Sequence, residues 1–291
     1  MSSVIPMLVP HWGKEGGRAK ERIAVMNQPS PTISVIIPAY ERADILIMCL
    51  QSLEMQTVRD FEVLVIDDGS EEPLEPIVAR KNLSIKPRWQ LLETKNTRAS
   101  AKNAGIEQAQ GKIALFWDAD MVADSRMIEY HIENHLTRSE TLVVIGYRFH
   151  LANSALPFDQ LSHLVTRKSV SFNLSRIQCD HRERYFRSLE WELSRSEAPW
   201  REAIGCHIST PLSLLREHGG FDSSFDGAYG YEDHDLAYRL YCQNITFLLE
   251  ARAVGYHFDH APLSGPSHDM EKQQNKALFR EKHPQAFWLP H

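Results

Sequence analysis

Apolar residues along the first half of the chain alternate between the pattern of buried strands and that of amphipathic helices. Continuous apolar runs rich in β-branched residues, typical of strands buried on both faces of a parallel sheet, cover 34–40, 61–70, 89–93 and 113–117. Apolar residues at helical spacing cover 43–55, 74–80 and 98–109. This alternation predicts a Rossmann-like α/β fold, with a doubly wound, mostly parallel sheet flanked by helices.

The second half of the chain keeps this regularity only in part. A helix around residues 127–136 is followed by an apolar run at 142–147, which predicts another buried strand. Residues 151–203 combine many arginines and aromatic residues without a clear period. We expect a variable lobe there, although a solvated charged helix is the alternative. The pattern then returns, with helices expected near 211–218 and 232–242 and strands near 246–249 and 253–257.

Composition and charge narrow the class of protein. The 291 residues are 43% hydrophobic and 24% charged, which is typical of a globular chain. A net charge of −6 and a pI near 6.2 argue against a nucleic-acid partner. No apolar run reaches 18 residues, so no membrane span is expected. Four widely spaced cysteines favour a reduced chain in the cytoplasm, with peripheral attachment to the inner face of a membrane left open.

Polar residues follow three of the expected strands at the point where each strand ends. Tyr40 and Glu41 follow the first strand, Asp67-Asp68 ends the second, and Asp118-Ala119-Asp120 follows the strand at 113–117. In an open parallel sheet, ligands bind beyond the carboxyl ends of the strands. We therefore expect these side chains to gather at one edge of the sheet.

The triplet Asp118-Ala119-Asp120 is the candidate metal motif. In an extended chain its two carboxylates point to the same side and can face one Mg²⁺ or Mn²⁺ ion, which would also bind a diphosphate. Solvated turn acids are the alternative for any isolated triplet of this kind. A second triplet, Asp233-His234-Asp235, opens a helix and is therefore placed less well for such a site.

Three further positions have both a structural and a chemical interpretation. Asp67-Asp68 can be a simple strand-ending turn, or Asp68 can accept hydrogen bonds from a nucleotide ribose. Glu232 and Asp233 can serve as acidic residues at a helix start, or Asp233 can be a general base. His257 follows a strand and is either structural or a third metal ligand.

Taken in order, these stretches resemble the family 2 glycosyltransferases of the GT-A fold. The resemblance covers about 32–257 and rests on these segments: SVIIPAYERAD, LVIDDGS, NTRASAKNAGIEQAQGKI, LFWDADM and GGFDSSFDGAYGYEDHDLAYRL. The last segment also resembles the galactosyltransferase and N-acetylgalactosaminyltransferase branch. The ordered set is far more specific than any one of its members.

The resemblance implies a role for each candidate residue. Pro38, Tyr40 and Glu41 would line the nucleotide pocket, Asp68 would contact the base or ribose, and Asp67 would support that loop. Lys102 stands where relatives more often have arginine, and would place a cation near the pyrophosphate. The remaining implied residues are Asp118, Ala119 and Asp120 at the metal and donor sugar, His257 as a further metal ligand, Asp233 as base and Glu232 orienting the acceptor.

The resemblance also implies an activity and a division of the chain. It implies an inverting transfer of a hexose or N-acetylhexosamine from a UDP-sugar, assisted by Mn²⁺ or Mg²⁺. The acceptor could be a carbohydrate, lipid-linked, small-molecule or peptide group. Residues 1–30 would form an extension, 31–150 the donor half, 151–260 the acceptor and catalytic half, and 261–291 a tail with a helix. The alternative is an inactive GT-A protein that binds carbohydrate or acts as a scaffold.

Overall fold

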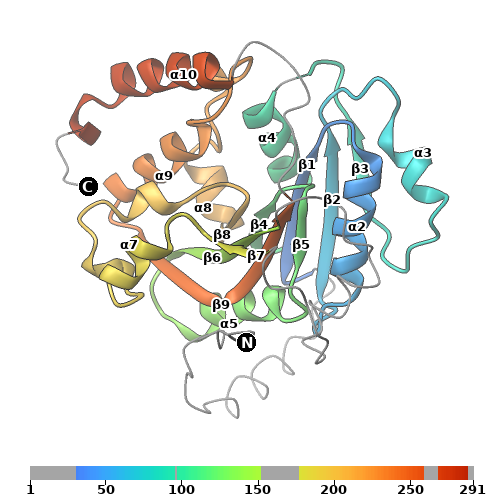
Figure 1. The fold of residues 1–291 in the computed structure, drawn as a ribbon, viewed down its shortest axis with the longest axis horizontal. Helices are drawn as coiled ribbons and strands as arrows, with labels where there is room; N and C mark the ends of the chain where they lie inside the picture. The colour runs from blue at the N-terminus through green and yellow to red at the C-terminus, as the bar shows by residue number, and fades with distance from the viewer. Residues whose placement is uncertain (1–30, 96, 152–176, 259–267, 288–291) are drawn as a thin grey trace, which may run out of the picture.

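The computed structural model describes residues 31–95, 97–151, 177–258 and 268–287. The expected extension at 1–30 and about half of the expected lobe therefore lie outside the described residues. None of the described helices is long and apolar enough to cross a membrane. The described elements form one continuous sheet with helices on both of its faces (Figure 1).

The first four strands form the parallel half of the sheet. Their order is β3-β2-β1-β4, and every neighbouring pair is parallel. The connecting helices complete the doubly wound pattern that the sequence predicts. The elements are β1 (Ile33–Ala39), α2 (Ala43–Glu54), β2 (Phe61–Asp67), α3 (Leu74–Ala79), β3 (Arg88–Leu91), α4 (Arg98–Gln108) and β4 (Ile113–Trp117).

The second half of the sheet mixes strand directions. From β4 the order continues β8-β6-β9-β5, with β7 paired to the end of β6. Strand β6 is parallel to β9, whereas the other pairs in this half are antiparallel. The elements are β5 (Met121–Ala123), β6 (Leu142–Leu151), β7 (Ile177–Cys179), β8 (His207–Pro211) and β9 (Thr246–Phe258).

Two of the expected strands prove to be one. The sequence predicts separate strands near 246–249 and 253–257, but β9 runs through both segments. The register beside β6 jumps where Gly146 pairs with Glu250 and Tyr147 with Val254. A bulge of this kind breaks the regular pattern without ending the strand. The polar interruption at Glu250 and Arg252 therefore marks the bulge and not a turn.

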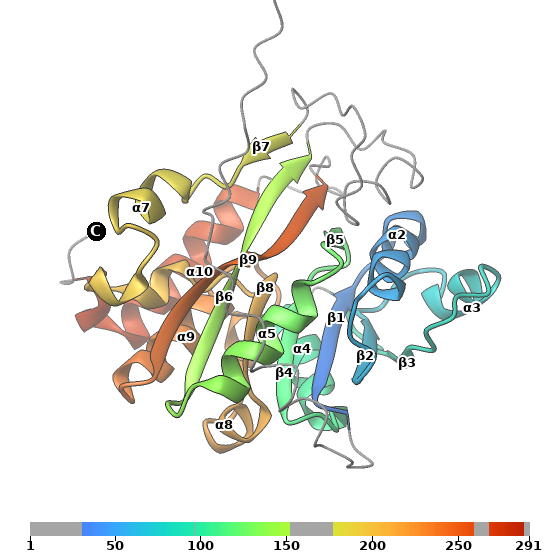
Figure 2. The ribbon, with the colours of Figure 1, turned by 90° about the horizontal axis from the view of Figure 1, so that it is seen from below.

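Side chains alternate between two apolar layers, one on each face of the sheet. Ile33, Val35 and Ile37 of β1 face the layer of α2, α3 and α5, whereas Ile36 faces the layer of α4, α8 and α9. In both ribbon views, α2 and α3 lie at the β1–β3 end of the molecule and α9 and α10 at the other end (Figure 2). The remaining helices are α5 (Met127–Thr137), α7 (Glu183–Ser188), α8 (Leu212–Glu217), α9 (Glu232–Cys242) and α10 (His268–Lys282), with short 3₁₀ helices η2 (Leu193–Arg195), η3 (Pro199–Glu202), η4 (Ser223–Phe225) and η5 (Pro284–Phe287).

A cluster of histidines joins α5 to the centre of the sheet. His131 Nδ1 and His135 Nε2 lie 2.8 Å and 2.9 Å from the hydroxyl of Ser209 on β8. The His207 ring packs 5.1 Å from that of His131, and a Cβ at Gly146 would come within 2.1 Å of it. Burial lowers the pKa of His131 to about 3 and that of His135 to about 4. The folded protein therefore keeps these rings neutral.

Acid should unfold the protein through this cluster. The unfolded chain takes up protons near pH 6.5, whereas the folded rings do not until about pH 3–4, so stability falls as the pH drops through that window. Each such histidine contributes about 1.4 kcal/mol per pH unit. His131→Leu should make the free energy of unfolding, measured with urea, less dependent on pH by about that amount between pH 6 and 4.5. An unchanged slope in the variant would contradict this assignment.

Candidate active site

A cavity of about 1050 Å³ opens beyond the carboxyl ends of β1 and β4. Its walls come from both halves of the sheet and from α4, α9 and α10. The candidate residues that line it are Pro38, Tyr40, Glu41, Asp68, Lys102, Asp118, Ala119, Asp120, Glu232, Asp233 and His257. The structure thus brings together side chains that are widely separated in the sequence. Their chemical roles remain predictions.

The loops after β1 and β2 are tied to each other at the rim of this cavity. The Glu41 N–H donates to the Ser70 hydroxyl at 2.8 Å, and a Glu41 carboxylate oxygen accepts the N–H of Glu71 at 2.8 Å. Glu41 and Arg42 both have left-handed φ angles, near 54° and 53°, which are unfavourable outside glycine. Cross-loop hydrogen bonds of this kind hold the strained backbone in place.

Asp67 lies beneath the loop and is not part of the cavity wall. Its two carboxylate oxygens accept the N–H groups of Ser70 and Leu74, each at 3.0 Å. The side chain is 2% exposed. This geometry fits the supporting position that the resemblance implies for Asp67, and gives it no direct contact with a ligand in the cavity.

Asp68 connects the same loop to the start of α4. Its carboxylate accepts the N–H of Thr97 at 2.9 Å and also the Thr97 hydroxyl. Burial raises the pKa of Asp68, against the hydrogen bonds from Thr97. Asp226 accepts the next helix N–H groups, from Ala99 at 2.8 Å and Ser100 at 3.2 Å. Two carboxylates from distant segments therefore cap the start of α4.

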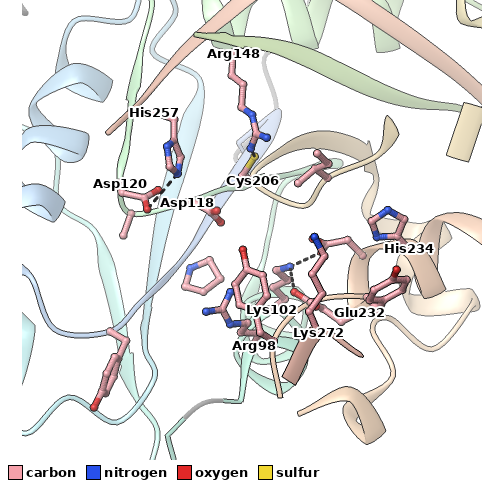
Figure 3. Close-up of a pocket in the computed structure, with 18 of the residues that line it drawn as sticks. Arg98, Lys102, Asp118, Asp120, Arg148, Cys206, Glu232, His234, His257 and Lys272 are labelled. Atoms are coloured by element: carbon pink, nitrogen blue, oxygen red, sulfur yellow. Dashed lines mark hydrogen bonds and ion pairs between the residues drawn. The ribbon is translucent and has the colours of Figure 1, made fainter. Parts of the chain in front are cut away.

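The triplet at 118–120 is a tight turn between β4 and β5, which corrects the extended geometry expected from the sequence. The Met121 N–H closes the turn by donating to the Asp118 carbonyl at 3.1 Å. Pairing of Met121 with His257 in the β5–β9 ladder then brings the histidine alongside the turn. His257 Nε2 lies 3.5 Å from Asp120 Oδ2 (Figure 3).

The charges of this turn repel one another. Burial and then the nearby charge of Asp120 raise the pKa of Asp118 to about 6. Burial alone would lower the pKa of His257, but hydrogen bonding and attraction to Asp120 raise it instead. A cation between these groups would relieve the repulsion between the carboxylates.

Asp118 and Asp120 therefore fit a divalent metal, with diphosphate oxygens supplying further ligands as is common for Mg²⁺. Within the described ranges, no three His, Cys, Asp or Glu side chains are grouped closely enough to hold a metal by themselves.

A buried ion-pair cluster lies between α4 and α9. Lys102, 4% exposed, places its ammonium 3.0 Å from Glu232 Oε1 and also in contact with Asp233 Oδ1 (Figure 3). Burial would raise the pKa of Asp233, but Lys102 outweighs it and holds that pKa below its ordinary range. A Cβ at Gly205 would come within 2.1 Å of Asp233, so only glycine fits beside this pair. Asp233 is thus held ionised in the cavity wall.

The second acidic triplet does not form a metal site. Asp235 is 1% exposed and is not among the residues that line the cavity. Its carboxylate accepts a hydrogen bond from Arg239 Nε at 2.8 Å and lies 2.7 Å from His283 Nε2. Side chains at positions i and i+2 of a helix point in different directions. Asp233 therefore faces the cavity, while Asp235 contacts His283 near the C-terminus.

Several wall residues were missed by the sequence analysis. Arg98 stacks over Tyr229 with its guanidinium 4.5 Å from the ring centroid. Arg148 lies within β6, a strand that is otherwise mostly apolar, and its Nη1 donates to Cys206 Sγ at 3.1 Å. A charged residue inside such an apolar run could have indicated from the sequence that Arg148 belongs to the site. Lys272 comes from α10, which was expected only as part of a tail.

The open α/β sheet, with carboxylates gathered beyond its strand ends, defines a protein of the GT-A type. The chain also matches glycosyl transferase family 2 over residues 34–191, more than half of its length. It therefore belongs to glycosyltransferase family 2.

The chain is similar to several enzymes of known sequence. It is 29% identical over 272 residues to the validoxylamine A glucosyltransferase of Streptomyces hygroscopicus subsp. jinggangensis, covering 89% of this chain and 63% of the relative. It is 26% identical over 238 residues to the chondroitin synthase of Escherichia coli, covering 77% of this chain and 34% of that protein. The chain thus spans only part of these relatives.

Two solved structures share the fold. The mannosyltransferase PcManGT of Pyrobaculum calidifontis, in complex with GDP-Man and Mn²⁺, has a TM-score of 0.59 at 17% identity, over 92% of this chain and 70% of its own. S. aureus TarS 1-349, in complex with UDP-GlcNAc, has a TM-score of 0.58 at 17% identity, over 86% and 66%. At this identity the likeness establishes the fold.

Proposed function

We propose that the protein transfers a hexosyl or N-acetylhexosaminyl group from a UDP-sugar to an acceptor hydroxyl, with inversion. One observation carries the proposal: Asp118 and Asp120 on one side and Asp233 on the other line a single cavity large enough for a nucleotide sugar. Membership of family 2 supports sugar transfer, and the UDP-GlcNAc complex of TarS supports the donor class.

In this mechanism the loops after β1 and β2 receive the nucleotide. Pro38, Tyr40 and Glu41 form the wall against the base, and Asp68 accepts from the base or ribose. Asp118, Ala119 and Asp120 lie at the diphosphate and donor sugar. The carboxylates of Asp118 and Asp120, with His257 and oxygens of the diphosphate, would hold Mn²⁺ or Mg²⁺, which when bound would neutralise charge on the departing UDP.

Proton removal is assigned to Asp233. It stays ionised because Lys102 offsets the effect of burial on its pKa. The resemblance places Lys102 near the pyrophosphate, whereas its ammonium pairs here with Glu232 and Asp233. We assign it the role of holding both acids in position, with Glu232 orienting the acceptor. The acceptor oxygen would attack the anomeric carbon from the side of Asp233, and UDP would leave from the opposite side. The configuration at that carbon would therefore be inverted.

Three finer features complete the proposal. The segment at 219–240 carries the resemblance to the galactosyltransferase and N-acetylgalactosaminyltransferase branch. Residues 31–150 would supply most of the donor site and 151–260 the acceptor side, although β6 pairs across that boundary with β8 and β9. All four cysteines are free, which supports a reducing compartment such as the cytoplasm.

Metal dependence gives the first test. Asp120→Asn, or chelation with EDTA, should weaken UDP binding at least tenfold, because loss of even an outer-shell partner costs about 10–100-fold in metal affinity. Titration calorimetry with UDP and Mn²⁺ measures the effect. Asp44→Asn, an exposed acid at the start of α2, is the charge-matched control. Equal UDP affinity with Mn²⁺ and with EDTA would contradict the metal assignment.

A further inference from the structure

Cations gather on a part of the cavity wall to which the proposed donor chemistry assigns no role. Arg148, Arg182, Arg201 and Lys272 come from β6, the segment before α7, η3 and α10, and all four line the cavity. Figure 3 shows Lys272 well away from Asp120, the candidate metal ligand. The wall formed by these four cations is called the cationic wall below.

Three cations of this wall act on His234. The ring of His234 lines the cavity at the start of α9 and packs 5.2 Å from the ring of Tyr231. Burial lowers the pKa of His234, and the charges of Lys272, Arg201 and Arg182 lower it further, against Asp233. Cations from three separate elements thus act at one place beside the proposed base.

Two of the cations share a single buried carboxylate. Asp180 receives Arg182 in a two-point contact, with Nη2 at 2.6 Å and Nε at 3.0 Å, and Arg148 Nε lies 3.4 Å away. All three residues are nine-tenths or more buried. The other contact of Arg148 is with the Cys206 thiol, whose pKa burial raises to about 12, so the thiol is neutral. The charge of Asp118, which lines the same cavity, also acts on Arg148.

Two further acids lie among these cations. Glu202 faces Arg182 and Arg201, and burial raises its pKa. Glu271 lies next to Lys272 in the sequence and is the third acid on this side. Among the described residues, four cations from separate elements therefore line this side of the cavity, and Asp180 holds Arg182 and Arg148 in place there. Cations fixed around an open cavity favour an anionic ligand.

We propose that the cationic wall binds an anionic group, phosphate or carboxylate, carried by the acceptor. This deepens the proposed function and rests on it, since it presumes that the wall faces the acceptor. The shared chemistry is a group with several anionic oxygens, which planar guanidinium groups bind well. Tyr185 and Tyr231 line the same side of the cavity and offer flat surfaces for a sugar ring.

The structure holds Lys272 in place although its side chain is exposed. Asn275, 2% exposed, donates to the carbonyls of Phe225 at 3.0 Å and Gly230 at 2.7 Å. Phe279 packs 5.6 Å from Tyr231. These contacts fix α10 against the loop that leads into α9, so Lys272 is presented beside the proposed base.

Binding of anions to the full chain tests the proposal. UDP with Mn²⁺ is titrated first, and the UDP-saturated protein is then titrated with inorganic phosphate, with glucuronate, and with glucose as the neutral control. The expected result is saturable binding of one anion, at least about tenfold tighter than glucose. Tighter phosphate binding indicates a phosphorylated acceptor, and tighter glucuronate binding indicates a uronate acceptor.

Variants connect this binding to the wall. Arg148→Met removes one cation of the wall while Asp180 keeps Arg182, so the variant should fold. Arg148→Met and Lys272→Ala should each weaken anion binding about tenfold or more. Lys276→Ala, on the same helix but outside the cavity lining, is the matched control and should bind as wild type. Lys272→Ala should leave UDP affinity unchanged.

Three results would overturn the proposal: no preference for either anion over glucose, displacement of UDP by the anions, or unchanged anion affinity in both variants. Displacement would show that the cations belong to the donor diphosphate. A chain that binds no UDP in the first titration refutes the proposed function instead. The anion titrations repeated without UDP then still decide whether the subsite exists.

Discussion

Replacing Asp233 with asparagine is expected to lower kcat for sugar transfer by about 10²–10⁴-fold, the range that general-base catalysis contributes. Asparagine keeps the shape of the side chain and cannot accept the proton. The metal turn lies on a different segment, so UDP and Mn²⁺ affinity should change little. A loss confined to kcat would place the defect in the chemical step.

The control for this variant is Asp222→Asn. Asp222 caps η4 and pairs with Lys282 outside the cavity, so its loss should leave kcat unchanged. Retention of near wild-type kcat by Asp233→Asn, with donor and metal still bound, would rule out Asp233 as the base. The remaining cavity acids would then have to be tested for that role.

Replacing Lys102 with methionine is expected to destabilise the fold by about 3–5 kcal/mol, as measured for buried pairs that lose one partner. Glu232 and Asp233 would be left as adjacent buried acids without their cation. In the wild type, Lys102 keeps the pKa of Asp233 low against the effect of burial, so this stabilisation is fully present from neutral pH down to about pH 4. In the variant, burial would raise the pKa of Asp233 instead, so the folded chain takes up a proton more readily than the unfolded chain and the deficit should shrink as the pH falls toward 4.

Urea unfolding at pH 7 and pH 4.5 measures both effects. Lys282→Met is the matched control, because Lys282 and Asp222 form a Lys–Asp pair at 2.8 Å with each side chain 33% exposed. A pair that exposed contributes at most about 1 kcal/mol. Equal destabilisation of the two variants would show that the buried cluster has no special energetic role.

The sequence predicts the parallel half of the fold well because a strand buried on both faces of the sheet is a continuous apolar run. The run at 113–117 matches β4 at both ends, and 43–55 matches α2 to within one residue. Strands β5 and β7 have three residues each, too short for any periodicity. Strand β8 contains the polar residues His207, Ser209 and Thr210 and so lacks an apolar run, although all three side chains are buried.

The candidate site was predictable where it depends on strand ends and not where it depends on tertiary contacts. Asp68 and Asp118 follow directly from the rule that ligands bind at strand carboxyl ends. The turn at 118–120 could not be told from an extended segment, because both place acids after a strand. The pairing of Lys102 with Glu232 joins helices distant in sequence, and the pairing of Arg148 with Asp180 joins β6 to the segment before α7.

The central claim is that this cavity cleaves a UDP-sugar with the help of a metal, and release of UDP tests it most directly. Purified protein is incubated with UDP-hexoses and UDP-N-acetylhexosamines, with Mn²⁺ or EDTA, and with neutral, phosphorylated and uronate sugars as acceptors. The account predicts UDP release from at least one donor with Mn²⁺, abolished by EDTA and strongly reduced in Asp120→Asn and Asp233→Asn. Tight UDP binding without release of UDP from any donor–acceptor combination would contradict it and favour an inactive carbohydrate-binding protein.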